Sequence, residues 1–325
     1  MLRGVFKAPS SSANVGPGYD VFSMALEKPF LTVEISVDEG DEIVVVNKGR
    51  YGGLMSTVPE KNAGAIAATK LLQKKGLRKK VELVFYADIP PRKGLGASGA
   101  EAAAAVFGLN KLLSIGMKPH ELVEAAAAAE PGGHPDNVAA SLLGGFVACL
   151  REGEGLSVLK INPPEDLGIV VIVPDVSKES TAMARKAVPE KLSLETHVEV
   201  VSRVGVAALA LCRGDIDMFL RAVSRDPFVE YFRAEAGVYG EGVDGRKLLT
   251  EKERLLKKYN VAEVVSGAGP SRVLFFKISE NSQQRGTRPV DAAVEEVVEG
   301  FKAAGYSVSE IFETRPSLTG CIQTA

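Results

Sequence analysis

A glycine-rich stretch in the first half of the chain has the residue types and the spacing of a phosphate-binding loop. The stretch reads Pro90-Pro91-Arg92-Lys93-Gly94-Leu95-Gly96-Ala97-Ser98-Gly99-Ala100. It follows a strand-like run at 81–86 and precedes an alanine-rich segment whose apolar residues recur at helical intervals. Glycines let a backbone approach a ligand closely, and the first turn of a helix attracts anions through its N–H groups and its dipole. The stretch therefore predicts a site for the phosphates of a nucleotide, with the Ser98 hydroxyl available to a phosphate or a metal ion.

Other interpretations of this stretch compete with the phosphate site. Ser98 and Glu101 are spaced as a capping box, which would only start a helix; this alternative stays open. The three glycines formally match the dinucleotide pattern G-x-G-x-x-G, which requires a second strand ending in an acid about 20 residues later. Here residues 114–119 connect two predicted helices, so that pattern is set aside. A Walker loop is excluded because no Gly-Lys-Ser/Thr follows the glycines.

Two further loops of small residues could bring a ligand close to the backbone. In the segment 8–20, predicted as a loop, Asn14 and Asp20 flank a Gly-Pro-Gly hinge that can aim both side chains into one cavity; a plain surface loop is the alternative. Thr181 and Arg185 lie four residues apart and would share one face of a helix. The second loop, between strand-like runs at 261–265 and 272–277, is Ser266-Gly267-Ala268-Gly269-Pro270-Ser271.

The elements that must position these groups mix strands and helices. Two β-rich runs at 30–36 and 42–46, separated by a polar turn with Gly40, predict a hairpin. Asn62 is the natural N-cap of a helix at 63–75. A helix that starts at Pro119 ends at Glu130, where a carboxylate opposes the helix dipole, so a bound cation or solvent exposure is expected there. The other predicted elements are a short helix in 134–145, a polar connector at 152–166, a buried strand at 167–173, a long helix at 192–212, a helix at 290–304 and a strand at 307–312.

Composition limits the classes of function. The chain has 325 residues, 46% of them hydrophobic, which suits two domains of about 150 residues each. A net charge of −2 without a basic stripe argues against a nucleic-acid partner. The sequence has no apolar run of about 18 residues and no apolar signal region, which predicts a cytoplasmic protein without a membrane partner. Three distant cysteines and three histidines without zinc-ligand spacing predict free thiols and no zinc site.

The order of the small-residue loops resembles that of a known superfamily. Together, the stretches at 10–20, 94–98 and 266–270 resemble the three motifs of the GHMP kinases, which include galactokinase, homoserine kinase, mevalonate kinase and phosphomevalonate kinase. Within that superfamily the likeness is greatest to the homoserine kinases. The segments that carry it are Ser11-Ser12-Ala13-Asn14, Gly18-Tyr19-Asp20 and His134-Pro135-Asp136-Asn137-Val138-Ala139.

The resemblance implies an α+β fold of two domains with the active site between them. Residues 1–164 would form an N-terminal ATP-binding domain of the ribosomal protein S5 domain 2 type, and residues 165–325 a ferredoxin-like C-terminal domain. The mixture of predicted hairpins and helices independently favours α+β over a doubly wound parallel sheet. Members of the family often dimerise, so a homodimer is one arrangement that the resemblance implies.

The resemblance also implies a site for ATP, Mg²⁺ and an amino acid. The loop 90–100 would hold the triphosphate, Asn62 would contact adenine, and Ser98 and Glu130 would hold Mg²⁺. Gly267 would steady the phosphate loop beside the substrate. The residues expected around the amino acid are Asn14, Asp20, Asn137, Arg185 and Arg233, with Thr181 nearby.

The chemistry of L-homoserine suits these residue types. Asp20 can pair with its ammonium group, Arg185 and Arg233 can grip its carboxylate, and Asn137 can orient its hydroxyl. The implied reaction is direct in-line transfer of the γ-phosphoryl group, which gives O-phospho-L-homoserine for threonine biosynthesis. Such transfers depend mostly on positioning and charge stabilisation. Because Asn137 cannot take up a proton at neutral pH, we expect no strong general base, with catalysis resting on Asn137, Thr181 and Arg185.

The sequence departs from the family pattern at two places. Ala97 replaces the first of two usual serines, and Glu101 stands where small residues are usual. Only three residues separate Glu130 from His134, fewer than in the family. Two alternatives therefore remain: another GHMP kinase acting on a mevalonate- or pantoate-like hydroxy acid, or a ligand sensor of the same fold without catalysis. Ser98 and Glu130, both present, favour an enzyme.

Overall fold

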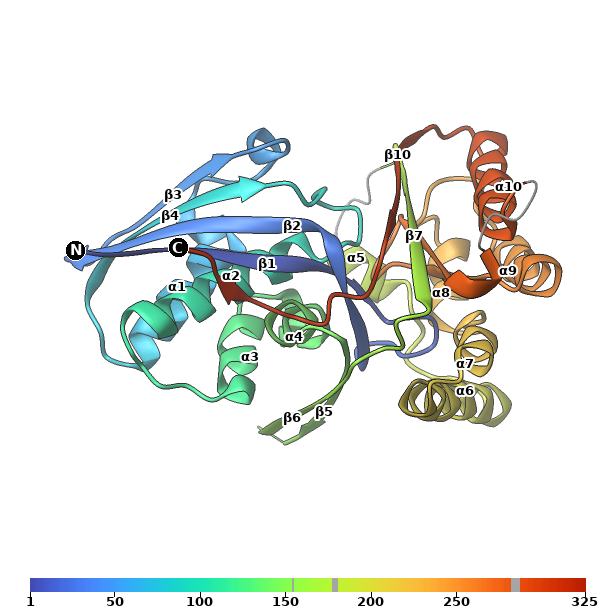
Figure 1. Cartoon of the computed structure of the whole chain (residues 1–325), viewed down its shortest axis with the longest axis horizontal. Helices are drawn as coiled ribbons and strands as arrows, with labels where there is room; N and C mark the ends of the chain where they lie inside the picture. The colour runs from blue at the N-terminus through green and yellow to red at the C-terminus, as the bar shows by residue number, and fades with distance from the viewer. Residues whose placement is uncertain (154, 177–180, 282–286) are drawn as a thin grey trace.

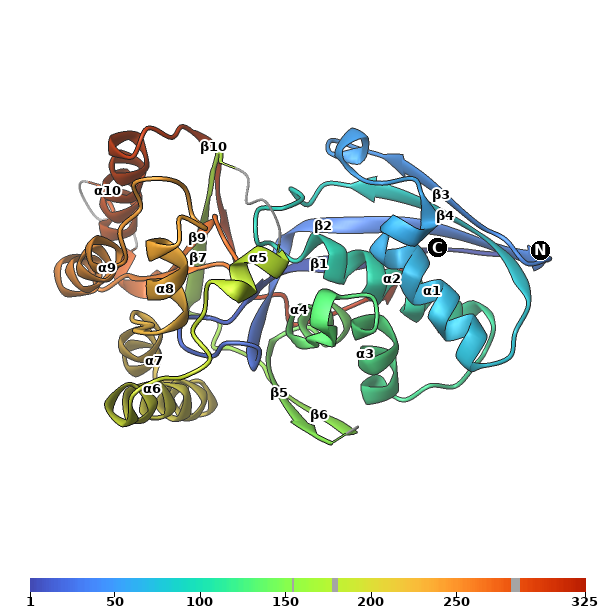
Figure 2. The same ribbon diagram turned by 180° about the vertical axis from the view of Figure 1, so that it is seen from behind.

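The computed structural model describes residues 1–153, 155–176, 181–281 and 287–325. Its helices and strands form two halves that lie end to end along the longest axis of the molecule (Figure 1). Each half is built on one β-sheet with helices packed against it. The first half contains α1–α4, and the second contains α6–α10, while the short helix α5 lies between the halves (Figure 2).

The first sheet is mostly antiparallel and has the order β11-β1-β2-β4-β3, with β5 paired to β2 and β6 paired to β5. Among the described strands of this sheet, only β3 and β4 run parallel. The long strand β2 is the centre of this half, because β1, β4 and β5 all pair with it. The strands are β1 (Leu2–Ala13), β2 (Phe22–Glu39), β3 (Ile43–Lys48), β4 (Lys79–Ala87), β5 (Phe146–Glu152), β6 (Gly155–Ile161) and β11 (Ile322–Gln323).

Three expectations for this sheet were wrong. The runs at 30–36 and 42–46 do not form a hairpin, because β4 lies between β2 and β3. The alternate residues Val81, Leu83 and Phe85 of β4 are fully buried, which favours a position inside the sheet and leaves β3 at its edge. The supposed loop at 8–20 is strand as far as Ala13, and much of the supposed connector at 152–166 is strand β6.

Four helices cover one face of the first sheet: α1 (Ala63–Lys74), α2 (Ala97–Leu112), α3 (Pro119–Ala127) and α4 (Asp136–Leu143). The alanine-rich helix α2 buries much of its length, and its small side chains let it approach β1 closely. At Gly108, an added Cβ atom would lie 2.4 Å from Ile35 and 2.8 Å from Phe6. The predicted N-cap of α1 is confirmed, since the Asn62 side chain accepts a hydrogen bond from the Ala65 N–H.

The second sheet is antiparallel with the order β10-β7-β9-β8, formed by β7 (Leu167–Pro174), β8 (Ala262–Val265), β9 (Arg272–Lys277) and β10 (Val308–Thr314). Helices follow β7 and β9 in the chain, so the sequence of elements gives the predicted ferredoxin-like order. These helices are α5 (Thr181–Lys186), α6 (Leu194–Arg213), α7 (Ile216–Val223), α8 (Val229–Glu235), α9 (Gly245–Tyr259) and α10 (Pro289–Ala303).

The last ten residues return to the first half. Pro316 bridges to Leu26, β11 pairs with β1, and the Val5 N–H donates to the Ala325 carbonyl. The tail therefore completes the first sheet, while a boundary at 164/165 stays a prediction. Among the helices of the described residues, none has the length and apolar character required to span a bilayer.

Candidate active site

A cavity of about 460 Å³ lies where the two halves meet. It collects residues from the loops at 10–20, 90–98 and 266–268, together with side chains from α2, α4, α5 and α8. Most of the residues predicted from the sequence line it: Asn14, Asp20, Asn62, Pro90, Pro91, Arg92, Gly94, Leu95, Gly96, Ala97, Ser98, Glu130, Asn137, Arg185, Arg233 and Gly267. Lys93, Gly99 and Ala100 are not in this wall, and the Thr181 side chain lies outside the described structure.

The glycine loop ends at the first turn of α2, which opens onto the cavity. Gly96 is the N-cap in a left-handed conformation (φ 69°), and no side chain of the described residues caps this end of the helix. The capping-box interpretation of Ser98 and Glu101 is therefore wrong. The N–H groups of residues 97–99 have no acceptor within the helix, so this turn is suited to bind an anion.

Contacts from two distant segments hold the glycine loop in place. Gly94 has a φ of 82°, and an added Cβ atom would lie only 2.1 Å from the Ser266 carbonyl oxygen. The Ser266 hydroxyl donates to the Gly94 carbonyl at 2.8 Å. At Gly96 an added Cβ atom would lie 2.1 Å from the Ser11 Oγ atom. The three small-residue stretches thus meet at one point, and larger residues could not replace these two glycines.

Lys93 belongs to the loop in sequence but points out of the cavity. Its Nζ atom donates to the carbonyls of Pro174 and Val176 at 2.8 and 2.7 Å. Pro174 is the last residue of β7 and Val176 follows it, so the lysine ties the loop to the second half. Burial lowers the pKa of the Lys93 ammonium. The lysine therefore serves as a structural tether between the halves.

The adenine contact expected of Asn62 competes with bonds already made. Its Oδ1 atom caps α1, and its Nδ2 atom donates to Glu101 at 2.9 Å. The Glu101 carboxylate also accepts from the backbone N–H groups of Ala63 and Gly64. Burial, and after it the charge of Glu130, raises the pKa of Glu101 to about 8. Glu101 therefore turns toward the first turn of α1 instead of capping its own helix.

Asp20 and Arg185, predicted to bind opposite ends of the substrate, contact each other. The Arg185 Nη2 atom donates to both carboxylate oxygens of Asp20, at 2.8 and 2.7 Å. Its Nη1 atom donates to the Tyr19 hydroxyl at 2.9 Å. The side chains of Asp20 and Arg185 are 34% and 29% exposed, so a ligand in the cavity can reach both. A zwitterion can separate this pair and supply each member with a new opposite charge.

Arg233 is almost fully enclosed and is held by backbone carbonyls. Its Nε atom donates to the Ala184 carbonyl at 2.9 Å and its Nη1 atom to the Gly267 carbonyl at 3.2 Å. The Tyr19 ring covers its guanidinium group at 5.1 Å. Asn14 donates to the same Gly267 carbonyl at 2.8 Å. Arg233 thus fixes α5 and the 266–271 loop around the cavity, and adds positive charge to one wall.

Asn137 stands beside the phosphate loop with its amide in a defined orientation. The Ser11 hydroxyl donates to its Oδ1 atom at 2.8 Å, which leaves the Nδ2 group to donate to a ligand. The neighbouring Asp136 carboxylate is buried and accepts from the Asn137 N–H at 2.8 Å. Its other contact is the His134 ring, whose Nδ1 atom lies 3.1 Å away. Burial lowers the pKa of His134, but the hydrogen bond and charge of Asp136 outweigh it, so the pKa is raised.

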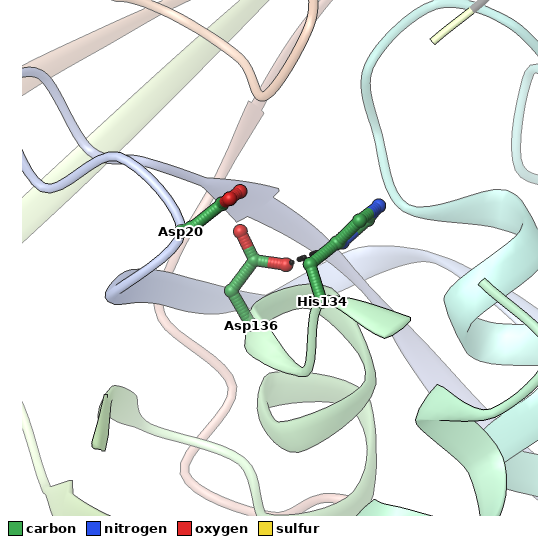
Figure 3. Close-up of side chains that lie close together, drawn as sticks. All are labelled: Asp20, His134 and Asp136. Carbon is green, nitrogen blue, oxygen red and sulfur yellow. Dashed lines mark hydrogen bonds and ion pairs between the residues drawn. The ribbon is translucent and has the colours of Figure 1, made fainter. Parts of the chain in front are cut away.

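Oxygen donors suited to a metal ion lie at two places in this wall. Ser98 and Glu130 both line the cavity, and the short Pro131–Gly133 turn keeps Glu130 there. Hydroxyl and carboxylate oxygens are ligands that Mg²⁺ accepts. Asp20, His134 and Asp136 also bring one ligand atom each within 4.8 Å of one another (Figure 3). That second group is less suited, because Asp20 is bound to Arg185 and Asp136 already accepts two hydrogen bonds.

Several residues in the wall or directly behind it were not assigned roles from the sequence. Tyr19 and Ser11 stand inside the motifs quoted for the resemblance, so their positions carried a signal that was not used. Glu101 was interpreted only as a capping partner of Ser98 and as a departure from the family pattern. Its partner Asn62 is 39 positions away, and nothing in the local sequence indicates that pairing.

Comparison with known proteins identifies the family to which this architecture is similar. Residues 63–145 match the model of the GHMP kinases N-terminal domain. The homoserine kinase of Methanococcus vannielii is 32% identical over 276 residues, which covers 83% of this chain and 86% of that protein. The crystal structure of homoserine kinase from Cytophaga hutchinsonii has a TM-score of 0.80 at 25% identity, covering 100% of this chain and 98% of that one.

A more distant structure shares the fold alone. Mevalonate-3-kinase from Thermoplasma acidophilum, solved with mevalonate 3-phosphate and ADP, has a TM-score of 0.64 at 14% identity and covers 100% of this chain and 99% of its own. Together these likenesses confirm the predicted α+β GHMP kinase fold.

Proposed function

This chain belongs to the homoserine kinases of the GHMP kinase family, and on that premise we propose how its cavity carries out the phosphoryl transfer. The γ-phosphoryl group of ATP passes to the side-chain hydroxyl of L-homoserine in one in-line step. The observation that carries the proposal is the convergence of an anion-binding helix turn, the Asp20–Arg185 pair and the Asn137 amide on one cavity. Each matches a different part of the two substrates.

The Asp20–Arg185 pair supports binding of an α-amino acid. L-homoserine carries an ammonium and a carboxylate on the same carbon, so it presents two opposite charges at a short separation. Its ammonium group replaces Arg185 at Asp20, and its carboxylate replaces Asp20 at Arg185. Each protein charge then keeps an opposite partner, which avoids leaving an unpaired charge in a partly buried site. A mevalonate-like acid has no ammonium group and would leave Asp20 without a partner.

The first turn of α2 and the 90–98 loop support binding of the triphosphate. N–H groups of residues 97–99 and the helix dipole attract the phosphates, while the contacts of Gly94 and Gly96 keep the loop in one conformation. Ser98 and Glu130 would hold Mg²⁺, which neutralises phosphate charge when it is bound. Asn62 lies in the same wall, and its contact with the base would have to compete with its hydrogen bonds to Ala65 and Glu101.

Asn137 supports positioning of the acceptor hydroxyl without a general base. Because Ser11 occupies the Oδ1 atom of Asn137, its Nδ2 group would donate to the hydroxyl oxygen of the substrate. That hydrogen bond would orient a lone pair of the hydroxyl oxygen toward the phosphorus. An amide does not take up a proton at neutral pH, so the hydroxyl proton leaves late, to solvent or to phosphate. Arg185 and Thr181 would complete the surroundings of the transferred group. Rate enhancement then comes from alignment and charge stabilisation.

A coupled assay for ADP release with three acceptors tests this function. We expect turnover with L-homoserine and far less with mevalonate or pantoate. A Ser98→Ala variant serves as the control, because it removes a proposed metal ligand and should lower turnover at a fixed Mg²⁺ concentration. Greater turnover with mevalonate or pantoate would indicate a different GHMP kinase, and no turnover with any acceptor would indicate a sensor.

A further inference from the structure

Helix α8 carries two charged side chains that are almost fully buried. Glu230 and Arg233 are each 2% exposed, and residues three positions apart in a helix point to the same side. The first turn of the helix is fixed by Asp226, whose carboxylate accepts hydrogen bonds from the N–H groups of residues 228–230 at 3.0 to 3.1 Å. Both charged side chains therefore start from a backbone that is held in place.

The Glu230 carboxylate connects helix α9 to the end of strand β8. One of its oxygens accepts a hydrogen bond from the Val265 N–H at 2.8 Å, and the other is paired with the ammonium group of Lys252 on α9. Helix α8 lies between α9 and α5 (Figures 1 and 2). Val265 is the last residue of β8, at the edge of the second sheet. Glu230 thus supplies the acceptor that a buried N–H group at a sheet edge needs.

Stability alone does not explain the buried pair of Glu230 and Lys252. Lys252 is 0% exposed, so both charges have been removed from water. Apolar residues of similar volume often stabilise a core as well as a buried ion pair does, or better. What the pair supplies is direction: the ammonium group fixes one carboxylate oxygen of Glu230, so the other oxygen stays aimed at the Val265 N–H.

The segment that follows β8 contacts both parts of the cavity. The Ser266 hydroxyl donates to the Gly94 carbonyl of the phosphate loop at 2.8 Å. The Gly267 carbonyl accepts a hydrogen bond from Arg233 at 3.2 Å, in the wall proposed to bind the amino acid. Glu230 therefore holds the chain on one side of Ser266, and Arg233 holds it on the other side. A shift at the end of β8 would move the contacts to both substrates.

We propose that Glu230 is a positioning residue for the phosphoryl transfer, acting on both substrates through residues 265–267, with Lys252 orienting its carboxylate. The effect on turnover rests on the proposed function, whereas the hydrogen bond to Val265 does not. Glu230 is not among the described residues that line the cavity, so it acts only through the segment that it holds. Without this acceptor the buried Val265 N–H has no partner, which favours movement of the strand end toward water.

Two double variants separate this role from a role in stability alone. The first, Glu230→Gln with Lys252→Met, keeps an oxygen acceptor for the Val265 N–H, and the second, Glu230→Met with Lys252→Met, removes it. Both lose the ion pair and leave one buried polar group unpaired, so their melting temperatures should be similar. KM for ATP and for L-homoserine should rise together by about 10-fold in the second variant and stay within about twofold of the wild type in the first. Asp217→Asn with Lys277→Met, which removes an exposed pair of the same half, should change neither KM.

Amide hydrogen exchange measures the hydrogen bond without reference to turnover. In the wild type and the first double variant, the Val265 N–H should exchange as slowly as N–H groups inside β9, and in the second variant about 10-fold faster or more. Fast exchange at Val265 in the wild type, equal KM values in the two double variants, or KM losses that follow the melting temperature would each overturn the proposal. If the wild type did not phosphorylate L-homoserine, the proposed function would fail. Weaker binding of a non-hydrolysable ATP analogue by the second variant alone would still support the positioning role.

Discussion

Replacing Asp20 with asparagine should change which acceptor the enzyme prefers. In the free protein the carboxylate accepts two hydrogen bonds from Arg185, at 2.8 and 2.7 Å. With L-homoserine bound, the ammonium group is expected to take the place of Arg185. Asparagine keeps the size of the side chain and one acceptor for Arg185, but it removes the negative charge. The variant therefore tests the ammonium contact with little change of shape.

The size of the effect follows from the exposure of the pair. A hydrogen bond to a charged group contributes about 1.5–3 kcal/mol. Because the side chains of Asp20 and Arg185 are 34% and 29% exposed, water screens the charges and the lower part of that range applies. A loss of about 2 kcal/mol corresponds to a roughly 30-fold rise in KM for L-homoserine. The contact is the same in the ground state and the transition state, so kcat should change little.

A second acceptor turns this effect into a change of preference. 4-Hydroxybutyrate has the hydroxyl and the carboxylate of L-homoserine but no ammonium group. In the wild type it must separate Arg185 from Asp20 and leave a carboxylate without a partner, whereas in Asp20→Asn it leaves none. We therefore expect Asp20→Asn to bind 4-hydroxybutyrate at least as well as the wild type does.

Steady-state kinetics with both acceptors measure the outcome. The ratio of kcat/KM for L-homoserine to that for 4-hydroxybutyrate should fall about 30-fold or more in Asp20→Asn. Asp41→Asn is the matched control, since Asp41 also pairs with an arginine, Arg78 at 2.7 Å, but on the surface away from the cavity. An unchanged ratio in Asp20→Asn, or an equal fall in Asp41→Asn, would refute the role of Asp20 in binding the ammonium group.

Three other substitutions test the phosphate loop, the buried Glu101 carboxyl group and the expected absence of a general base at Asn137. Gly94→Ala should lower kcat/KM for ATP by about 100-fold, because the strained φ of 82° and a Cβ atom 2.1 Å from a carbonyl oxygen must displace the loop. Gly53→Ala is the control and should be neutral, since nothing lies within 4 Å of an added Cβ atom there. Comparable losses of kcat/KM in both variants would contradict this prediction. Burial raises the pKa of Glu101 to about 8, so between its unfolded pKa and pH 8 the folded protein holds a proton that the unfolded chain releases. The stability that this carboxyl contributes is then fully present below its unfolded pKa and falls as the pH rises toward 8, by at most about 1.4 kcal/mol per pH unit. Urea unfolding at pH 5.5 and 8 should show a smaller fall for Glu101→Gln than for the wild type, and equal falls would refute the buried acid. Asn137→Asp should give no gain in kcat and an unchanged pH–rate profile, whereas a large gain would show that a general base at this position is useful.

Local sequence patterns predicted the parts of the site that depend on backbone conformation. Glycines with positive φ at 94 and 96 and the N-cap at Asn62 stand where their residue types require. Each of these features involves only a few neighbouring residues. Their convergence on one cavity came from the resemblance to the GHMP kinases, because the order of three motifs carries information that no single motif contains.

Features that depend on distant partners were not predictable in this way. The turn near Gly40 suggested that β2 and β3 pair as a hairpin. Instead β4, whose alternate side chains are buried, lies between them. Glu101 was judged against Ser98, three residues away, although its partner Asn62 is the N-cap of another helix. Asp20 and Arg185 were each assigned to the substrate, whereas in the free protein they neutralise each other across 165 positions. When several side chains could pair with the same group, the folded structure and not the local sequence determines which of them does.

A crystal structure with a non-hydrolysable ATP analogue and L-homoserine would test the proposed chemistry most directly. We expect the phosphates at the N–H groups of residues 97–99, the substrate ammonium at Asp20 and the hydroxyl within hydrogen-bonding distance of the Asn137 amide. Phosphates bound away from the start of α2, or an amino acid bound while Asp20 and Arg185 remain paired, would contradict it.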